Sequence, residues 1–165
     1  MSTVQTLDRA GIAERIPHRG SMCLLEKLEN WDAQRIHCST MTHRDTGNPL
    51  RTASGLLAPN AIEYAAQAMA LHGGLTASAG QAPSAGYLAS VRSVRFGVDR
   101  LDQVEGAMQV HANRLSGDER QVLYEFNVLD ATDRPLAQGR AVVVLNTPLA
   151  SMETDQCAGT ENEPS

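Results

Sequence analysis

The chain has 165 residues, 42% of them hydrophobic and 20% charged, which is enough to form one globular domain with a full core. With two Phe, three Tyr and one Trp, that core must consist largely of aliphatic side chains and alanine. The formal net charge of −5 argues against general binding to nucleic acids or anionic membranes, because both attract basic proteins.

The cysteines and the first residues indicate a compartment. Cys23, Cys38 and Cys157 are widely spaced and form neither a disulfide framework nor a pair of metal ligands, so we expect reduced thiols. The opening stretch, MSTVQTLDRAGIAERI, lacks the apolar segment of a signal peptide, and no run approaches the length of a membrane span. We therefore expect a soluble, cytoplasmic protein.

Apolar patterns along the chain predict six strands and one long helix. Residues 1–8 are polar and are expected to be flexible, residues 9–146 form the domain, and the acidic residues 147–165 form a disordered tail. The predicted strands are 24–31, 34–43, 86–99, 107–115, 121–129 and 136–145, with a turn at Asp32–Ala33 between the first two.

The helix lies in residues 58–74, which read APNAIEYAAQAMALHGG. We expect Asn60 to cap its start and Gly73-Gly74 to end it. Its surface is apolar nearly all round, which is typical of a buried helix. This order of elements predicts an α+β fold, a curved antiparallel sheet of about six strands wrapped around one long central helix. The alanines allow the sheet to approach the helix closely.

Glu63 and Gln67 are the polar exceptions on this helix and share one face, since they are four residues apart. Burial of a carboxylate is costly unless the group is paired or used. Two interpretations are open. With Asn60 as the N-cap, Glu63 stands three residues later, where a carboxylate closes a capping box. Alternatively, Glu63 carries chemistry.

Two segments resemble a known family. IPHRGSMCLLEKL at 16–28 and AIEYAAQAM at 61–69 resemble the hotdog-fold 3-hydroxyacyl-carrier-protein dehydratases of the FabZ type, which carry a Pro-His-Arg segment and a Glu-x-x-Ala-Gln helix motif. GYLASVRSVRF at 86–96 resembles the long strand after that helix. HRDTGNPLR at 43–51 and IEYAAQAMALHG at 62–73 are similar to the ApeP-like dehydratases of aryl-polyene clusters.

The resemblance implies that a 3-hydroxyacyl thioester on acyl-carrier protein loses water to give the trans-2-enoyl thioester, without a cofactor. A base removes the proton beside the thioester carbonyl, and an acid protonates the departing hydroxyl. Glu63 is implied as the acid, with its pKa raised by burial, and amides at the helix N-terminus are expected to stabilise the enolate-like oxygen. The expected substrate-binding residues are His18, Met22, Asn60, Tyr64, Gln67 and Leu88.

The catalytic histidine departs from the family pattern. In FabZ-type enzymes it lies in a Gly-His-Phe-Pro turn before the helix, whereas the corresponding position here is Pro49, flanked by Asn48 and Leu50. His43 can replace it if the loop takes a different path. The other source is a His-bearing FabZ-like partner, so a homodimer and a heterodimer both remain open.

Three arginines are expected to dock the carrier protein, because such carriers are acidic and this chain is itself net negative. They are Arg92, Arg95 and Arg100. A regular strand points residues 92 and 95 to opposite faces, so we expect a bulge or a partial patch.

Three functions remain in view. The first is the dehydratase, which the Pro-His-Arg and Glu-Tyr-Ala-Ala-Gln motifs favour. The second is a non-catalytic or half-catalytic carrier-binding subunit of a heterodimer. The third is a hotdog thioesterase, which also uses a helix carboxylate. No metal site is expected, since His37, His72 and His111 show no ligand spacing.

Overall fold

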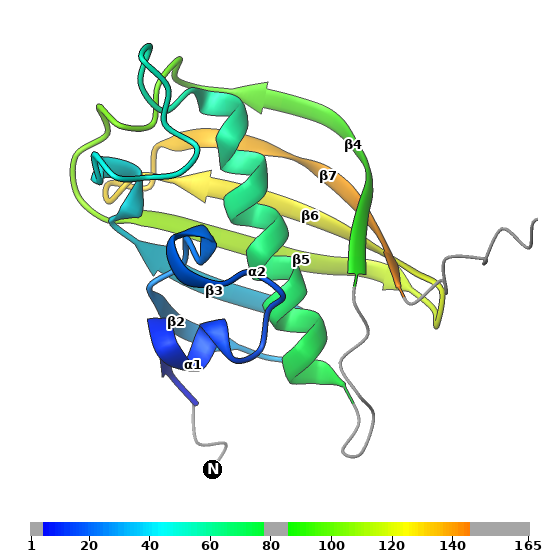
Figure 1. Ribbon diagram of the computed structural model, residues 1–165. Coiled ribbons are helices and arrows are strands. Elements are labelled where there is room, and N and C mark those ends of the chain that lie inside the picture. Colours follow the sequence, from blue (N-terminus) through cyan, green and yellow to red (C-terminus); the bar gives the residue numbers. More distant parts are fainter. Residues whose placement is uncertain (1–4, 78–85, 146–165) are drawn as a thin grey trace, which may run out of the picture.

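The computed structural model describes residues 5–77 and 86–145. Seven antiparallel strands form one sheet in the order β1-β2-β3-β5-β6-β7-β4, and the long helix α2 crosses one face of it (Figure 1). The strands are β1 (Leu7–Asp8), β2 (Lys27–Trp31), β3 (Arg35–Thr40), β4 (Gly86–Phe96), β5 (Met108–Gly117), β6 (Gln121–Leu129) and β7 (Pro135–Leu145). The helices are α1 (Arg9–Ala13) and α2 (Ala61–Thr76), and the short 3-10 turns are η1 (Gly20–Met22), η2 (Thr42–Arg44) and η3 (Ala58–Asn60).

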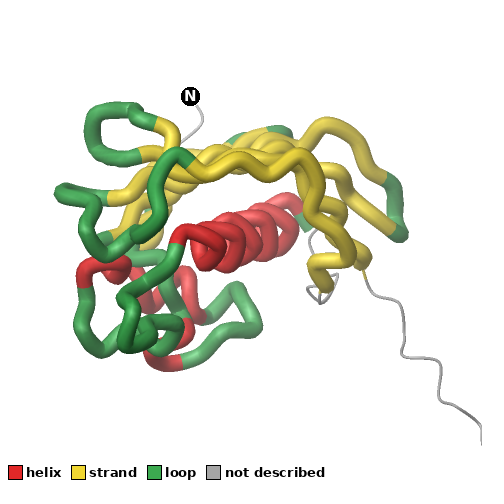
Figure 2. Tube along the Cα trace, turned by 90° about the horizontal axis from the view of Figure 1, so that it is seen from above, coloured by secondary structure: helices red, strands yellow, loops and turns green. Residues whose placement is uncertain are grey.

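The sheet arches over α2, as the view along the helix shows (Figure 2). Ala61, Ala65 and Ala68 are fully buried between the helix and the strands. Because alanine has a single methyl group, the backbone of the curved sheet can lie close to the helix. The expected α+β architecture is therefore present.

The sheet has one strand more than predicted. Leu7 and Asp8, which the sequence assigned to the flexible N-terminus, pair with Leu28 and Lys27 as β1. The first predicted strand begins at Lys27 instead of residue 24, because the carbonyl oxygen of Leu24 accepts hydrogen bonds from threonine hydroxyls and not from a ladder. The predicted acidic tail, 147–165, lies outside the described residues.

The prediction that Gly73-Gly74 ends the helix was wrong. α2 continues to Thr76, whose hydroxyl donates to the carbonyl oxygen of His72 at 2.8 Å. A Cβ atom on Gly74 would lie 3.3 Å from the carbonyl oxygen of Arg15, so glycine there permits close packing of the segment after α1. No helix among the described residues is both long and apolar enough to cross a membrane.

β4 contains the bulge that the arginine spacing required. Its pairing with β7 shifts between Arg92 and Arg95, and Ser93 has a positive φ of 53°. Arg92 faces Arg140 and Arg95 faces Gln138. Arg140 and Gln138 are two residues apart on β7, so the bulge brings both β4 arginines to the same face of the sheet.

Cys23 and Cys38 are buried free thiols, while Cys157 lies outside the described residues. Burial raises the pKa of the Cys38 thiol to about 12. Because the thiolate is the reactive form, this cysteine is an inert part of the core.

Candidate active site

Glu63 does not cap its helix. The 3-10 turn η3 runs directly into α2, so Glu63 lies beyond the first turn of a continuous helical segment. The side chain of Asn60 donates to the carbonyl oxygen of Leu57 and makes no capping hydrogen bond to the helix. Glu63 instead contacts two side chains, His18 and Gln67, and the capping-box interpretation therefore has no support in the geometry.

His18 is the histidine that meets this carboxylate. Its Nε2 lies 2.9 Å from Oε1 of Glu63, and the two side chains are 25% and 34% exposed. Its Nδ1 is buried, with no hydrogen-bond partner among the described residues. Forty-five positions separate the two residues in the sequence (63 − 18), so the pair is formed by the tertiary fold.

Gln67 connects the carboxylate to the segment that carries His18. It is fully buried, and its Nε2 donates to the carbonyl oxygen of Met22 at 2.7 Å and to Oε1 of Glu63 at 3.3 Å. Its Oε1 accepts from the backbone N–H of Leu24 at 2.9 Å. Both side-chain contacts of Glu63 thus fall on Oε1, and no described residue bonds to Oε2.

Two arginines fix the path of residues 16–24. Arg19 donates from Nη1 to the carbonyl oxygens of Ala13 and Ile16, at 2.5 and 2.6 Å. Arg9 donates to the carbonyl oxygen of Cys23 from both Nε and Nη2, at 3.1 and 2.8 Å. With Gln67 holding the same segment from the helix side, the position of His18 is determined at several points.

His43, the catalytic histidine expected from the sequence, is not paired with Glu63. It is fully buried, and its Nε2 donates to the carbonyl oxygen of Val104 at 3.0 Å. Burial lowers the pKa of its imidazole, which favours the neutral form. The loop directs His43 into the core and not toward the helix carboxylate.

Among the expected substrate contacts, Tyr64 lies in the core. It is fully buried, and its hydroxyl bonds with the side chains of Thr42 at 2.9 Å and Asn48 at 3.0 Å. These bonds hold the loop after β3 against α2. Burial raises the pKa of the Tyr64 phenol. We therefore correct its expected role from substrate contact to structural anchor.

Several amides at the start of the helix, where donors to the enolate-like oxygen were expected, are already bonded. The N–H of Ala58 donates to Asp99, that of Asn60 to Leu57, and that of Ala61 to residues of η3, while Pro59 has no N–H. The 3-10 turn thus satisfies these first amides of the helical segment.

A cavity of about 350 Å³ lies between the segment that carries His18 and the later part of α2, and neither His18 nor Glu63 belongs to its lining. Pro17 and Arg19, the two neighbours of His18, belong to its wall. Its apolar lining consists mainly of Ile16, Met69, Ala70, Val122, Val143 and Leu145. Ala70 and Gly74 line it from α2, and at seven and eleven positions beyond Glu63 they lie on the same helix face. This face leads from the carboxylate into the cavity.

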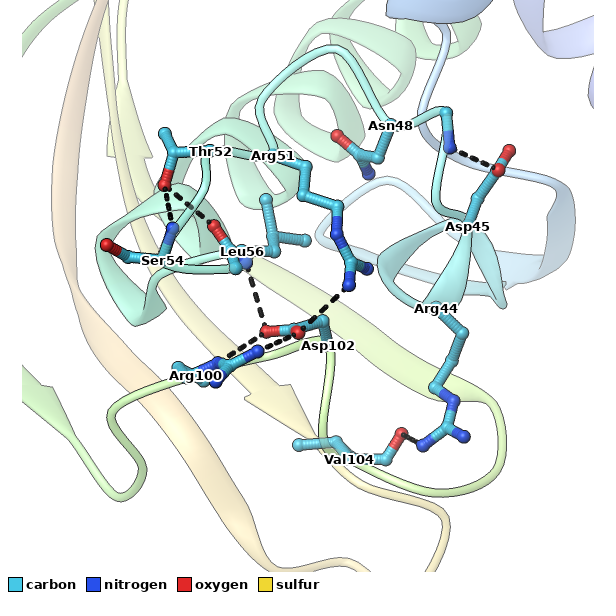
Figure 3. A network of polar contacts seen from close by, with 12 residues as sticks. Arg44, Asp45, Asn48, Arg51, Thr52, Ser54, Leu56, Arg100, Asp102 and Val104 are labelled. Carbon is cyan, nitrogen blue, oxygen red and sulfur yellow. Dashed lines mark hydrogen bonds and ion pairs between the residues drawn. The ribbon is translucent and has the colours of Figure 1, made fainter.

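Arg100 belongs to a network of polar contacts, although its side chain remains 36% exposed (Figure 3). Its guanidinium meets Asp102 at 2.5 and 3.1 Å, and Arg51 approaches the same carboxylate at 3.5 Å. The side chain of Asp102 is 3% exposed and also accepts from the N–H of Leu56. The Arg100 guanidinium lowers the pKa of Asp102 to about 2. Arg100 therefore holds two loops together. Gly55 favours glycine because its φ of 98° is one that other residues rarely adopt, and the Arg100 guanidinium lies where a Cβ atom would be.

The other expected site residues keep accessible positions. Arg92 and Arg95 are exposed, and Leu88 is 40% exposed on β4. Met22 is half-buried and contributes its carbonyl oxygen to Gln67.

Comparison with known proteins agrees with this fold. The family model described as ApeP dehydratase matches residues 10–154. The dehydratase heterocomplex ApeI:P from Xenorhabdus doucetiae is similar with a TM-score of 0.74 and 28% identity, over 82% of this chain and 91% of that chain. Thioesterase HI1161 from Haemophilus influenzae has a TM-score of 0.62 at 10% identity, over 92% and 99% of the two chains, and shows the fold alone. No curated protein matches.

An antiparallel sheet wrapped around a central helix is the hotdog fold, and the matching family model together with the similar heterocomplex identifies a hotdog-fold dehydratase. The chain belongs to the ApeP-like dehydratase family.

Proposed function

We propose that the protein dehydrates 3-hydroxyacyl groups carried as thioesters on acyl-carrier protein, with Glu63 transferring protons and His18 orienting it. The observation that supports this most directly is the 2.9 Å contact between His18 and Glu63. His18 thereby takes the place for which the sequence suggested His43.

The reaction needs a proton to leave C2 and another to reach the hydroxyl on C3. Oε1 of Glu63 is held by His18 and Gln67, which leaves Oε2 to face the substrate. Removal of the C2 proton gives an enolate-like thioester, the C3–O bond then breaks, and the hydroxyl leaves as water once protonated. The products are a trans-2-enoyl thioester and water, with no change in oxidation state. His18 acts through Glu63 as a positioning residue and shares a proton with it.

The cavity suits the acyl tail. Its wall includes an aliphatic part formed by residues such as Ile16, Met69 and Val143. Ala70 lies about 10 Å from Glu63 along the helix axis, given a rise of 1.5 Å per residue. With C2 and C3 at Glu63, the tail would extend along Ala66 and Ala70 toward Gly74. Small side chains on this face leave space for it.

The working assembly is proposed to be a heterodimer with a FabZ-like subunit in the cytoplasm, acting in aryl-polyene or fatty-acid-like synthesis. The similarity to a subunit of the ApeI:P heterocomplex supports this partnership. Arg92 and Arg95 remain candidates for carrier docking.

Mass spectrometry of the carrier protein tests the proposal. 3-Hydroxyacyl-carrier protein is incubated with this chain, with a FabZ-like subunit, and with both together. Dehydration removes one water from the carrier-bound group, whereas a thioesterase would release the whole acyl group and leave the bare phosphopantetheine arm. The full assembly is expected to remove water, and loss of the acyl group would establish the thioesterase instead.

His18 and His43 provide a matched pair of variants in the same assay. His18→Ala should slow dehydration, since Glu63 loses its partner at Oε1. His43→Ala should leave turnover at the wild-type level in the fraction that remains folded, since it contacts Val104 in the core. The reverse order of effects would return the catalytic role to His43.

A further inference from the structure

The cavity of about 350 Å³ changes in character from its interior to its mouth. The buried residues of its lining are apolar apart from one tyrosine hydroxyl, and they are Ile16, Met69, Val122, Tyr124 and Val143. The charged residues of the lining are half-buried or exposed, and they are Glu14, Arg15, Arg19, Arg114 and Asp118. An apolar interior with a charged mouth suits an amphipathic molecule that has one alkyl tail and one polar end.

Arg114, on β5, differs from the other two arginines of the cavity. The guanidinium groups of Arg15 and Arg19 donate to backbone carbonyl oxygens within residues 11–18. Within residues 5–77 and 86–145, the side chain of Arg114 has no hydrogen bond and no ion pair. Asp118, the nearest carboxylate along the chain, accepts two backbone N–H groups of its own turn. Because a half-buried charge gains free energy from a partner of opposite sign, Arg114 favours an anion in the cavity.

The tyrosine hydroxyl in the cavity wall is committed to another partner. Nε2 of His72 lies 2.8 Å from the carbonyl oxygen of Asp32, which only accepts, so Nε2 carries a proton. Burial lowers the pKa of His72 and favours the neutral imidazole, whose Nδ1 then accepts from the Tyr124 hydroxyl at 2.8 Å. Arg114 lies directly opposite Tyr124 in the pairing of β5 with β6, on the same face of the sheet. Arg114 is therefore the donor that this part of the wall keeps for a ligand.

We propose that the cavity binds a free alkyl carboxylate, such as a medium-chain fatty acid, with its carboxylate on Arg114 and its tail among Ile16, Met69 and Val143. A planar guanidinium matches a carboxylate through two parallel hydrogen bonds, which an alcohol or an amine cannot form. Ligand pockets usually enclose about 300–1,000 Å³, so a cavity at the lower end of this range limits the length of the tail. The bound acid would fill the space proposed for the acyl tail and inhibit dehydration by competition. Only this competition rests on the proposed function.

Calorimetric titration of the full chain with octanoate, octanol and octylamine tests the binding. Octanoate should bind about tenfold more tightly than octanol, because a hydrogen bond between two charged groups is stronger than one to a neutral hydroxyl. Octylamine should bind most weakly, since its ammonium group is repelled by Arg114. Arg114→Gln should remove the preference for octanoate and leave the affinity for octanol unchanged, which a loss of folding would not do. Arg140→Gln, the same change at an exposed position on β7, is the matched control and should bind octanoate as the wild type does.

Ala70→Leu tests the position of the tail, even if Arg114→Gln fails to fold. The larger side chain fills the cavity from α2 and keeps Arg114, so the affinities for octanoate and octanol should both fall. Equal affinity of the wild type for octanoate and octanol, or unchanged octanoate binding in either cavity variant, would overturn the inference.

The assembled enzyme tests the competition. Octanoate should raise the KM of the carrier-bound substrate and leave kcat unchanged, and an unchanged KM at saturating octanoate would refute competition. Because the titration requires no turnover, a failed dehydration assay leaves the binding result unaffected.

Discussion

Replacement of Glu63 by glutamine separates a catalytic carboxylate from a structural one. The amide oxygen of glutamine can occupy the place of Oε1 and still accept hydrogen bonds from His18 and Gln67. The helix is held by buried residues such as Ala61, Ala65 and Ala68, which the substitution does not touch. The variant therefore keeps the geometry of the site and loses the ability to exchange a proton.

The structural and catalytic interpretations of Glu63 predict effects of different size for Glu63→Gln. Since Glu63 is 34% exposed, its interaction with His18 resembles a surface ion pair, and its loss should lower the free energy of unfolding by at most about 1 kcal/mol. In a chain of this length that corresponds to a fall in Tm of about 2–4 °C. Loss of general acid–base catalysis lowers the rate by about 10²–10⁴, which is about 3–5 kcal/mol in activation free energy.

The assay measures turnover of 3-hydroxyacyl-carrier protein by the assembled dimer, together with thermal unfolding of each variant. Glu119→Gln, the same change in the exposed turn between β5 and β6, is the control for a nonspecific effect of charge. We expect a slow but folded Glu63→Gln enzyme. If that variant removes water at the wild-type rate, the carboxylate is structural and our assignment of the site is incorrect.

Three further predictions concern stability. Gln67→Leu should lower the free energy of unfolding by about 1–3 kcal/mol, because the buried N–H of Leu24 loses its acceptor. Denaturant unfolding measures this change, and an unchanged midpoint would contradict the structural role of Gln67. Asp102→Asn should destabilise the protein at pH 7. Because the folded pKa of Asp102 is depressed to about 2, its contribution is present above about pH 4 and disappears as the pH falls through about 2, so the difference in Tm between variant and wild type should shrink there. Burial lowers the pKa of His72, so the free energy of unfolding should fall as the pH drops below about 6.5. His72→Gln should reduce this dependence of stability on pH. Parallel pH profiles of the variant and the wild type would show that His72 does not cause the dependence.

Local patterns in the sequence were sufficient for most of the fold. Strand β6 was predicted with its observed bounds, because alternate residues such as Tyr124 and Phe126 face the core while their neighbours do not. The Asp32–Ala33 turn was also correct, since the side chain of Asp32 accepts from the N–H groups of Gln34 and Arg35. Both features depend on residues close together in the chain.

The errors in the predicted fold occurred where contacts between residues far apart in the sequence determine the structure. The glycines of α2 appeared to be a stop signal, but the helix continues past them to Thr76, and Gly74 lies close to the carbonyl oxygen of Arg15. The first strand begins late because Thr40 and Thr42 bind the carbonyl oxygen of Leu24. Neither contact leaves a periodic signal in the sequence.

The sequence itself determined the part of the site that lies on α2. Four-residue spacing places Glu63 and Gln67 on one face of a helix, whatever the rest of the chain does. The odd spacing of Arg92 and Arg95 likewise required a bulge if both were to share a face. His18 stood within a noted Pro-His-Arg segment, which was the only signal that it mattered.

Tertiary structure alone decided which histidine meets the carboxylate. His18 is forty-five positions from Glu63 and reaches it because Arg9, Arg19 and Gln67 fix the intervening segment against α2. His43 is closer in sequence, yet it is directed into the core toward Val104. The sequence determines helix faces through a fixed rise and rotation per residue, whereas a contact between a loop and a helix depends on every hydrogen bond that sets the path of the loop.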